Sequence, residues 1–220
     1  MATTGILAFA AAKIATEEEG KLPTYEKGIY IDTPTAIDVT LNYGNNPFYA
    51  GNREVNNDTD FTDGTITVGV AELGTNDKEA FENEQYILGG KLDTDADPDN
   101  PELLSGGEID SPYMGSGYIK TFKYAEKSAT GYEVTWFYRS KYTPTGESLA
   151  TKAGSTTFSA PSITGRLYTV PGIDPKINLR SRKRFQKMED AVAHLKQLAA
   201  VTTAAEATTT TSTTGDDKDL

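Results

Sequence analysis

The side chains best suited to acid–base and nucleophilic chemistry are scarce in this sequence. His194 is the only histidine and there is no cysteine, which excludes a histidine-activated thiol, a disulfide and a cysteine-ligated metal. The segment Gly115-Ser116-Gly117 precedes a predicted strand, whereas a phosphate-binding loop precedes a helix. We therefore expect His194 to be a surface residue on the flank of the last helix, and we expect the chain not to be an enzyme.

Alternating aspartates at positions 93, 95, 97 and 99 suggest a calcium loop. An EF-hand-like loop needs Gly at its sixth position and Glu at its twelfth. Counted from Asp93, these positions hold Pro98 and Leu104, and counted from Asp95 the twelfth position holds Gly106. Both registers fail, so we predict a solvated or interface loop here, with no metal and no cofactor.

Charge is distributed unevenly along the chain, whose net charge is −11. The segment 176–187 holds six basic residues and no acidic one, whereas the rest has 15 basic against 32 acidic residues. A basic cluster can bind nucleic acid, but the acidic body argues against tight phosphate binding. In a strand, the alternate arginines of this segment share one face, and we favour a contact with an acidic surface on a second copy. The candidate subunit-interface residues are Arg180, Arg182, Lys183, Arg184, Phe137 and Arg139.

Hydrophobicity with a period of two predicts a mainly β fold. In the stretch Tyr132–Tyr142, large residues including the single Trp alternate with polar or charged ones, as in a strand with one buried face and one face that is wet or paired with a partner. Further strands are predicted over 6–15, 36–43, 48–55, 65–71, 118–124, 156–167 and 178–185, helices over 76–87 and 187–200, and an acidic loop over 91–108.

The two ends of the sequence carry no targeting or membrane signal. No basic residue precedes the apolar run 6–12, so we predict a first strand there and not a secretory leader. No stretch approaches the ~20 apolar residues that span a membrane. The segment 202–220 is rich in Thr and Ala and has no large apolar residue before Leu220, which predicts a disordered tail.

The aromatic stretch belongs to an ordered series of short motifs. Trp136-Phe137-Tyr138-Arg139-Ser140-Lys141-Tyr142 is followed by Ser148-Leu149-Ala150-Thr151-Lys152 and then by Phe158-Ser159-Ala160-Pro161-Ser162-Ile163-Thr164-Gly165. Upstream, Asp58, Phe61, Gly64, Ile66 and Val68 follow a turn at 43–46, and 111–118 leads into the strand before the aromatic one. In this order the motifs resemble the major tail proteins of long-tailed, non-contractile bacteriophages.

The resemblance implies a fold, a function and partners. The expected fold is a tail-tube-type β-sandwich or half-barrel over residues 1–200 with one or two flanking α-helices, and 201–220 is a separate Thr-rich acidic tail. Six copies would form a ring, and rings would stack into a tube through which DNA passes without specific binding. The expected partners are further copies of the chain, the tape measure protein and the tail terminator and distal tail proteins. The location would be the virion tail, assembled in the host cytoplasm without a membrane.

Two details of this hypothesis come from the residues. The acidic body predicts a negative lumen that does not retain DNA, and the polar loops 142–156 and 91–111 are candidates for ring-to-ring or ring-to-neighbour contacts. Two other classes stay open. One is an extracellular β-sandwich binding or adhesion module that uses exposed aromatics such as Tyr113 or Phe137. The other is a capsid decoration or head–tail completion protein.

Overall fold

Strands dominate the computed structural model, which describes residues 2–32, 34–50, 53–70, 73, 77–95, 97, 101–107, 110–124, 129–143 and 162–201. The predicted mainly β fold class with two flanking helices is confirmed. The strands are β1 (Ala2–Thr16), β2 (Thr24–Ile31), β3 (Pro34–Tyr43), β4 (Asn46–Ala50), β5 (Arg53–Asp58), β6 (Phe61–Val70), β7 (Lys91–Asp93), β8 (Glu102–Leu104), β9 (Tyr113–Lys123), β10 (Thr130–Thr143), β11 (Ser162–Tyr168) and β12 (Arg180–Phe185). The helices are α1 (Asp77–Leu88) and α2 (Met188–Leu198).

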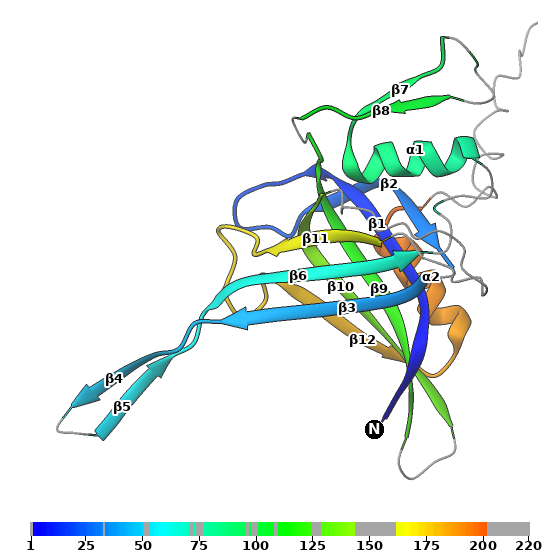
Figure 1. Ribbon diagram of the computed structural model, residues 1–220. Helices are drawn as coiled ribbons and strands as arrows, with labels where there is room; N and C mark the ends of the chain where they lie inside the picture. The colour runs from blue at the N-terminus through cyan, green and yellow to red at the C-terminus, as the bar shows by residue number, and fades with distance from the viewer. Residues whose placement is uncertain are drawn as a thin grey trace, which may run out of the picture.

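One antiparallel sheet organises the molecule, with its strands in the order β2-β1-β9-β10-β11-β6-β3 (Figure 1). Along one edge, β10 pairs with two strands: the part 132–137 pairs with β12, and the part 139–143 pairs with β11. The sheet divides at this point, and β11, β6 and β3 cross in front of the other strands (Figure 1). Because β3 also contacts β1, the sheet curls back toward itself.

Two hydrophobic cores lie on opposite faces of β1, β9 and β10. The inner core fills the space between these strands and the layer β11-β6-β3, and the helix core lies beneath α2. Successive residues of β1 alternate between the two cores, with Phe9 and Ala11 in the inner core and Ala8, Ala10 and Ala12 in the helix core. Because β1 is buried on both faces, this part of its sequence is an uninterrupted apolar run.

The aromatic strand β10 is also buried on both faces, and this corrects the expectation of one wet or partner-paired face. Trp136 belongs to the helix core, whereas Phe137 and Tyr142 belong to the inner core. Between Phe137 and Ser140 the register against β9 shifts, with three steps along β10 matching two along β9. This β-bulge moves Tyr142 to the face opposite Trp136, although uninterrupted alternation would place them together.

The indole of Trp136 packs directly on the backbone of β9. A Cβ at Gly115 or Gly117 would lie 2.6 or 2.7 Å from an indole carbon, so a larger residue at either position would displace the ring. The Gly115-Ser116-Gly117 segment therefore lies inside a strand, where its glycines leave room for the largest side chain of the helix core.

The remaining elements match the predictions less closely. The strand predicted over 48–55 is instead a hairpin of β4 and β5, and the acidic loop 91–108 contains the short hairpin of β7 and β8. Helix α1 ends where predicted, before Gly89 and Gly90, which adopt φ of +82° and +99°. The motif 148–152, the loop 144–161 and the tail 202–220 lie outside the described residues.

Candidate functional site

The outer face of the layer β10-β11-β6-β3 is polar, because the aliphatic residues of these strands point to the inner core. Strand register arranges its side chains in rows. One row holds Thr143, Thr164 and Thr67 and ends at Asp38, and the hydroxyl oxygens of Thr67 and Thr164 are 3.2 Å apart. The next row holds Lys141, Arg166, Thr65 and Thr40. These eight residues define the wet face.

At the β10 end of the wet face, three cations gather around two tyrosines. The Tyr113 and Tyr168 rings meet edge to face at 5.6 Å, and the Arg139 guanidinium lies 4.0 Å from the centre of the Tyr113 ring. Lys141 lies 5.6 Å from the same ring, and Arg166 lies 5.8 Å from Tyr168. We call these five residues the cationic corner. Tyr113 is 40% exposed, so the corner is open to a partner.

The basic strand β12 lies on the other branch of β10. Its register confirms that Arg180, Arg182 and Arg184 share one face, opposite Phe137, Thr135 and Glu133 respectively. Arg182 and Lys183 are exposed, whereas the Arg180 guanidinium lies 5.8 Å from the Phe137 ring. Phe137 itself is fully buried and is part of the inner core, so it offers no surface to a second copy.

A buried carboxylate anchors this basic strand. The Glu133 side chain is 4% exposed, and its oxygens lie 2.8 Å from the Lys120 ammonium and 2.7 Å from the Arg184 guanidinium. Burial by itself raises the pKa of Glu133, but Lys120 and Arg184 outweigh that effect and hold the pKa below its ordinary value. Sequence reasoning missed this ion triad because its members come from three strands; the only local signal was a Glu inside an aromatic strand.

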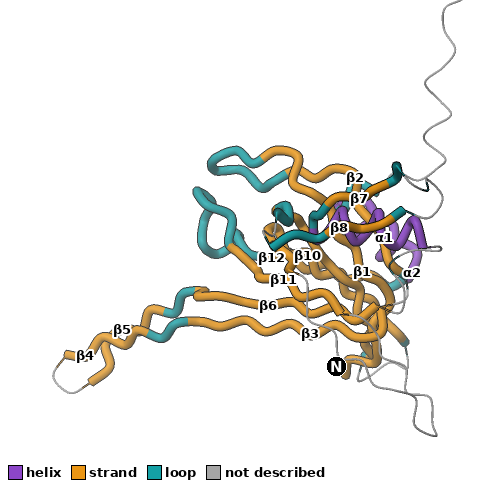
Figure 2. The backbone as a smooth tube through the Cα atoms, turned by 45° about the horizontal axis from the view of Figure 1, so that its top comes forward, coloured by secondary structure: helices purple, strands orange, loops and turns teal. Residues whose placement is uncertain are grey.

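A hairpin arm extends the ladder of β3 and β6 away from the body of the molecule (Figure 2). The Gly44 N–H donates to the Asp60 carbonyl at 2.8 Å, and the Asn42 amide donates to Asp63 at 2.8 Å. The rings of Tyr43 and Phe61 meet edge to face at 5.8 Å at the base of the arm. Beyond this point β4 and β5 pair with each other and project past the sheet (Figures 1 and 2).

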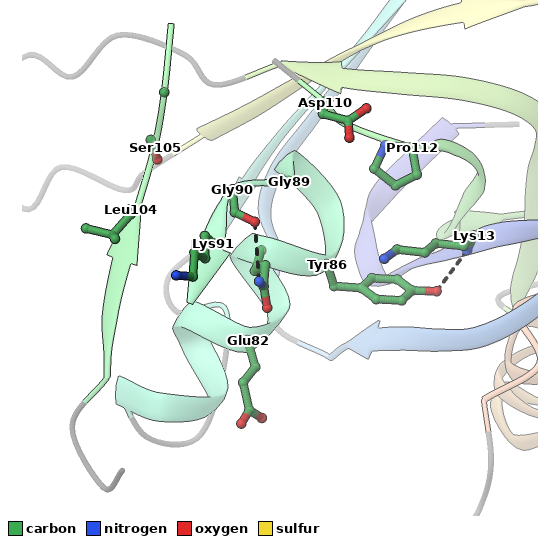
Figure 3. Close-up of a pocket in the computed structure, with 12 residues that line it drawn as sticks. Lys13, Glu82, Tyr86, Gly89, Gly90, Lys91, Leu104, Ser105, Asp110 and Pro112 are labelled. Atoms are coloured by element: carbon green, nitrogen blue, oxygen red, sulfur yellow. Dashed lines mark hydrogen bonds between the residues drawn. The ribbon is translucent and has the colours of Figure 1, made fainter. Parts of the chain in front are cut away.

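A hollow of about 950 Å³ lies between α1, the β7–β8 hairpin and β1 (Figure 3). The Tyr86 hydroxyl at its floor accepts a hydrogen bond from the Lys13 backbone N–H at 2.8 Å and donates to the Glu26 carbonyl at 2.9 Å. Burial raises the pKa of Tyr86. Since both partners are backbone groups at an irregularity in the β1–β2 ladder, the hydroxyl completes the ladder and is not free for acid–base chemistry.

The other residues considered from the sequence as catalytic or metal-binding candidates are His194 and the aspartates of the acidic loop. The His194 ring packs 5.2 Å from Phe185 and is partly buried, and burial together with nearby Lys183 lowers the pKa of His194. Within the described part of the chain, which includes the aspartates at 93, 95 and 97, no group of three or more His, Asp or Glu side chains could hold a metal ion. No helix among the described residues is long and apolar enough to cross a membrane.

Comparisons with known proteins add no family assignment. Neither a protein-family model nor a curated protein matches the chain.

Proposed function

We propose that the chain is a structural subunit of a bacteriophage tail tube and not an enzyme. Six copies form a ring, the rings stack, and the genome leaves the particle through the lumen on its way into the host. The ordered motifs of the sequence support this reading, and so do the two features of the fold described next. The same resemblance implies that the other partners within the virion tail are the tape measure protein, the tail terminator protein and the distal tail protein.

The wet face is the observation that carries the proposal. One side of β3, β6 and β11 closes the inner core, while the other side presents hydroxyl groups, charges and short side chains. Such a surface suits the wall of a water-filled channel. The layer ends at β3, which pairs with no described strand on its second edge. Open edges normally invite aggregation, and a closed ring of copies uses that edge for assembly.

The hairpin arm supports the second step, the stacking of rings. A two-stranded ribbon is marginally stable by itself in water, and β4 and β5 extend beyond the body of the molecule (Figure 2). A neighbouring ring would supply the surface that such an arm lacks. The predicted contact roles of the loops 142–156 and 91–111 remain predictions.

Negative-stain microscopy of concentrated protein tests the proposal. The intact chain should form rings or tubes of uniform width, alone or after addition of the initiator complex of the tail. A variant in which a short turn replaces 46–58 should keep the fold of the body and form rings that do not lengthen into tubes. Persistent monomers of the intact chain in both conditions would refute the tail-tube assignment.

One feature favours a second candidate, an extracellular binding module. Tyr113 is a partly exposed aromatic of the kind that contacts sugars or proteins. The other aromatic suggested for this role, Phe137, is buried and unavailable. A stable monomer that binds glycans or protein through Tyr113 would support this module, and binding to capsids in place of tubes would indicate a decoration or completion protein.

A further inference from the structure

The wet face carries opposite charges at its two ends. At the β10–β11 end, Lys141 and Arg166 are direct cross-strand partners, and like charges in that relation repel. Within the described part of the chain, neither of these two cations forms an ion pair. At the other end lies Asp38 on the edge strand β3, with Thr67 and Thr164 between it and β10. Asp63 belongs to the middle of the layer, because it is two residues along β6 from Thr65, the cross-strand partner of Arg166.

The cationic corner has the composition of a protein interface. Tyrosine and arginine are enriched where proteins meet, because they combine large contact area with hydrogen bonding and charge. Tyr113 and Tyr168 supply the aromatic surface, and Arg139 already forms an ion pair with Glu17, whose carboxylate is 3.5 Å away. Lys141 and Arg166 remain as the charges that an acidic partner would neutralise.

The open edge of β3 offers such an acidic partner. Asp38 is exposed in the middle of this edge strand. Strands β6 and β11 separate the β3 edge from Lys141 on β10, and β6 separates it from Arg166 on β11. A single copy therefore cannot bring the two ends of its own layer together, but a second copy placed head to tail can, and repetition of this contact closes a ring.

We propose that the cationic corner of one copy receives the β3 edge of the next, with Asp38 facing Lys141 and Arg166. This contact rests on the proposed ring assembly and specifies which surfaces form it. It also brings the Asp38 carboxylate beside the cations of the wet face, so the assembled wall is less positive at the corner than an isolated copy.

Two charge-reversed variants test the contact. The edge variant carries Asp38→Lys, and the corner variant carries Lys141→Glu and Arg166→Glu. Each variant alone places like charges across the contact, and the critical concentration for assembly should rise at least about tenfold. Mixed in equal amounts, the two variants present opposite charges at every contact, so alternating rings should form at concentrations where neither assembles alone.

Light scattering and negative-stain microscopy read out assembly, and circular dichroism verifies that each variant is folded. A control with Lys123→Glu and Lys176→Glu reverses two exposed charges outside the wet face and should assemble like the unmodified chain. If either variant alone assembles like the unmodified chain, or if two folded variants fail to rescue each other, the contact is wrong while the ring proposal stands. If the unmodified chain never assembles, both proposals fall.

Discussion

Replacing Glu133 by Gln tests whether the buried ion triad stabilises the fold. The carboxylate is 4% exposed, whereas the side chains of Lys120 and Arg184 are 29% and 54% exposed. Breaking a fully buried ion pair costs about 3–5 kcal/mol, and a surface pair contributes about 0–1 kcal/mol. Because both cations can turn toward water while the Gln amide N–H faces one of them, we expect a loss of about 2 kcal/mol.

Urea unfolding measures this loss. With a slope of about 1–3 kcal/mol per molar, the midpoint should fall by about 1 M at neutral pH. Because the pKa of Glu133 is lowered in the folded chain, its stabilisation is complete above the ordinary carboxyl pKa and is lost as the pH falls through the folded value. The difference between Glu133→Gln and the unmodified chain should therefore shrink as the pH falls below the ordinary carboxyl pKa and through the lowered folded value.

Glu18→Gln is the matched control, because Glu18 pairs with Lys21 at 2.6 Å on the surface, where the two side chains are 62% and 73% exposed. The same chemical change there should alter stability by less than about 0.5 kcal/mol. If Glu133→Gln lowers the free energy of unfolding by the same amount at low and at neutral pH, the loss comes from the changed shape of the side chain and not from its lost charge. A loss as small as that of the control would refute the triad as a stabilising feature.

Three further changes probe the two cores and the last helix. Leu195→Ala, in the helix core, should lower the unfolding free energy by about 2–5 kcal/mol, whereas Gln197→Ala on the exposed side of α2 should leave it nearly unchanged. Gly165→Ala places a Cβ 2.7 Å from an aromatic ring of the inner core and should cost about 1–3 kcal/mol, whereas Gly107→Ala meets nothing within 4 Å and should be neutral in thermal unfolding. Burial lowers the pKa of His194, so NMR titration should give a value below about 6.5, and stability should fall as the pH drops through that range, a dependence that the Gln variant lacks.

Alternation in the sequence predicted most strands of the sheet, because each of them has at least one face on a core, but it gave no strand over Thr24–Ile31, where β2 lies. The prediction failed where a single residue changed the phase. The bulge in β10 after Phe137 sends Tyr142 to the inner core, and no local signal marks an inserted residue of this kind. The hairpin of β4 and β5 reads as one strand in the sequence, because residues on both sides of the two-residue turn signal Gly51-Asn52 favour strand.

The functional surfaces were less predictable from sequence than the strands. The alternation of Arg180, Arg182 and Arg184 fixed their common face, but the ion triad and the cationic corner each combine residues from three strands. Long-range strand order decides which side chains become neighbours, and the sequence carries no direct record of that order. Phe137 illustrates the same point, since it is in phase with the polar residues Thr135 and Arg139, and this pattern hid its place in the inner core.

The distribution of apolar residues limits how copies of this chain can associate. Burial on both faces of β1 and β10, together with the core side of β3, β6 and β11, places the large aliphatic residues of these strands within single copies. The wet face has little apolar area to bury, so hydrophobic burial cannot drive a contact through that face. Association at the rim of this layer must then rely on strand pairing and on charge. Repulsion between like charges disfavours strand pairing in a wrong register. Contacts of this kind break and re-form readily, so in the proposed ring a misplaced copy would leave before the ring closes.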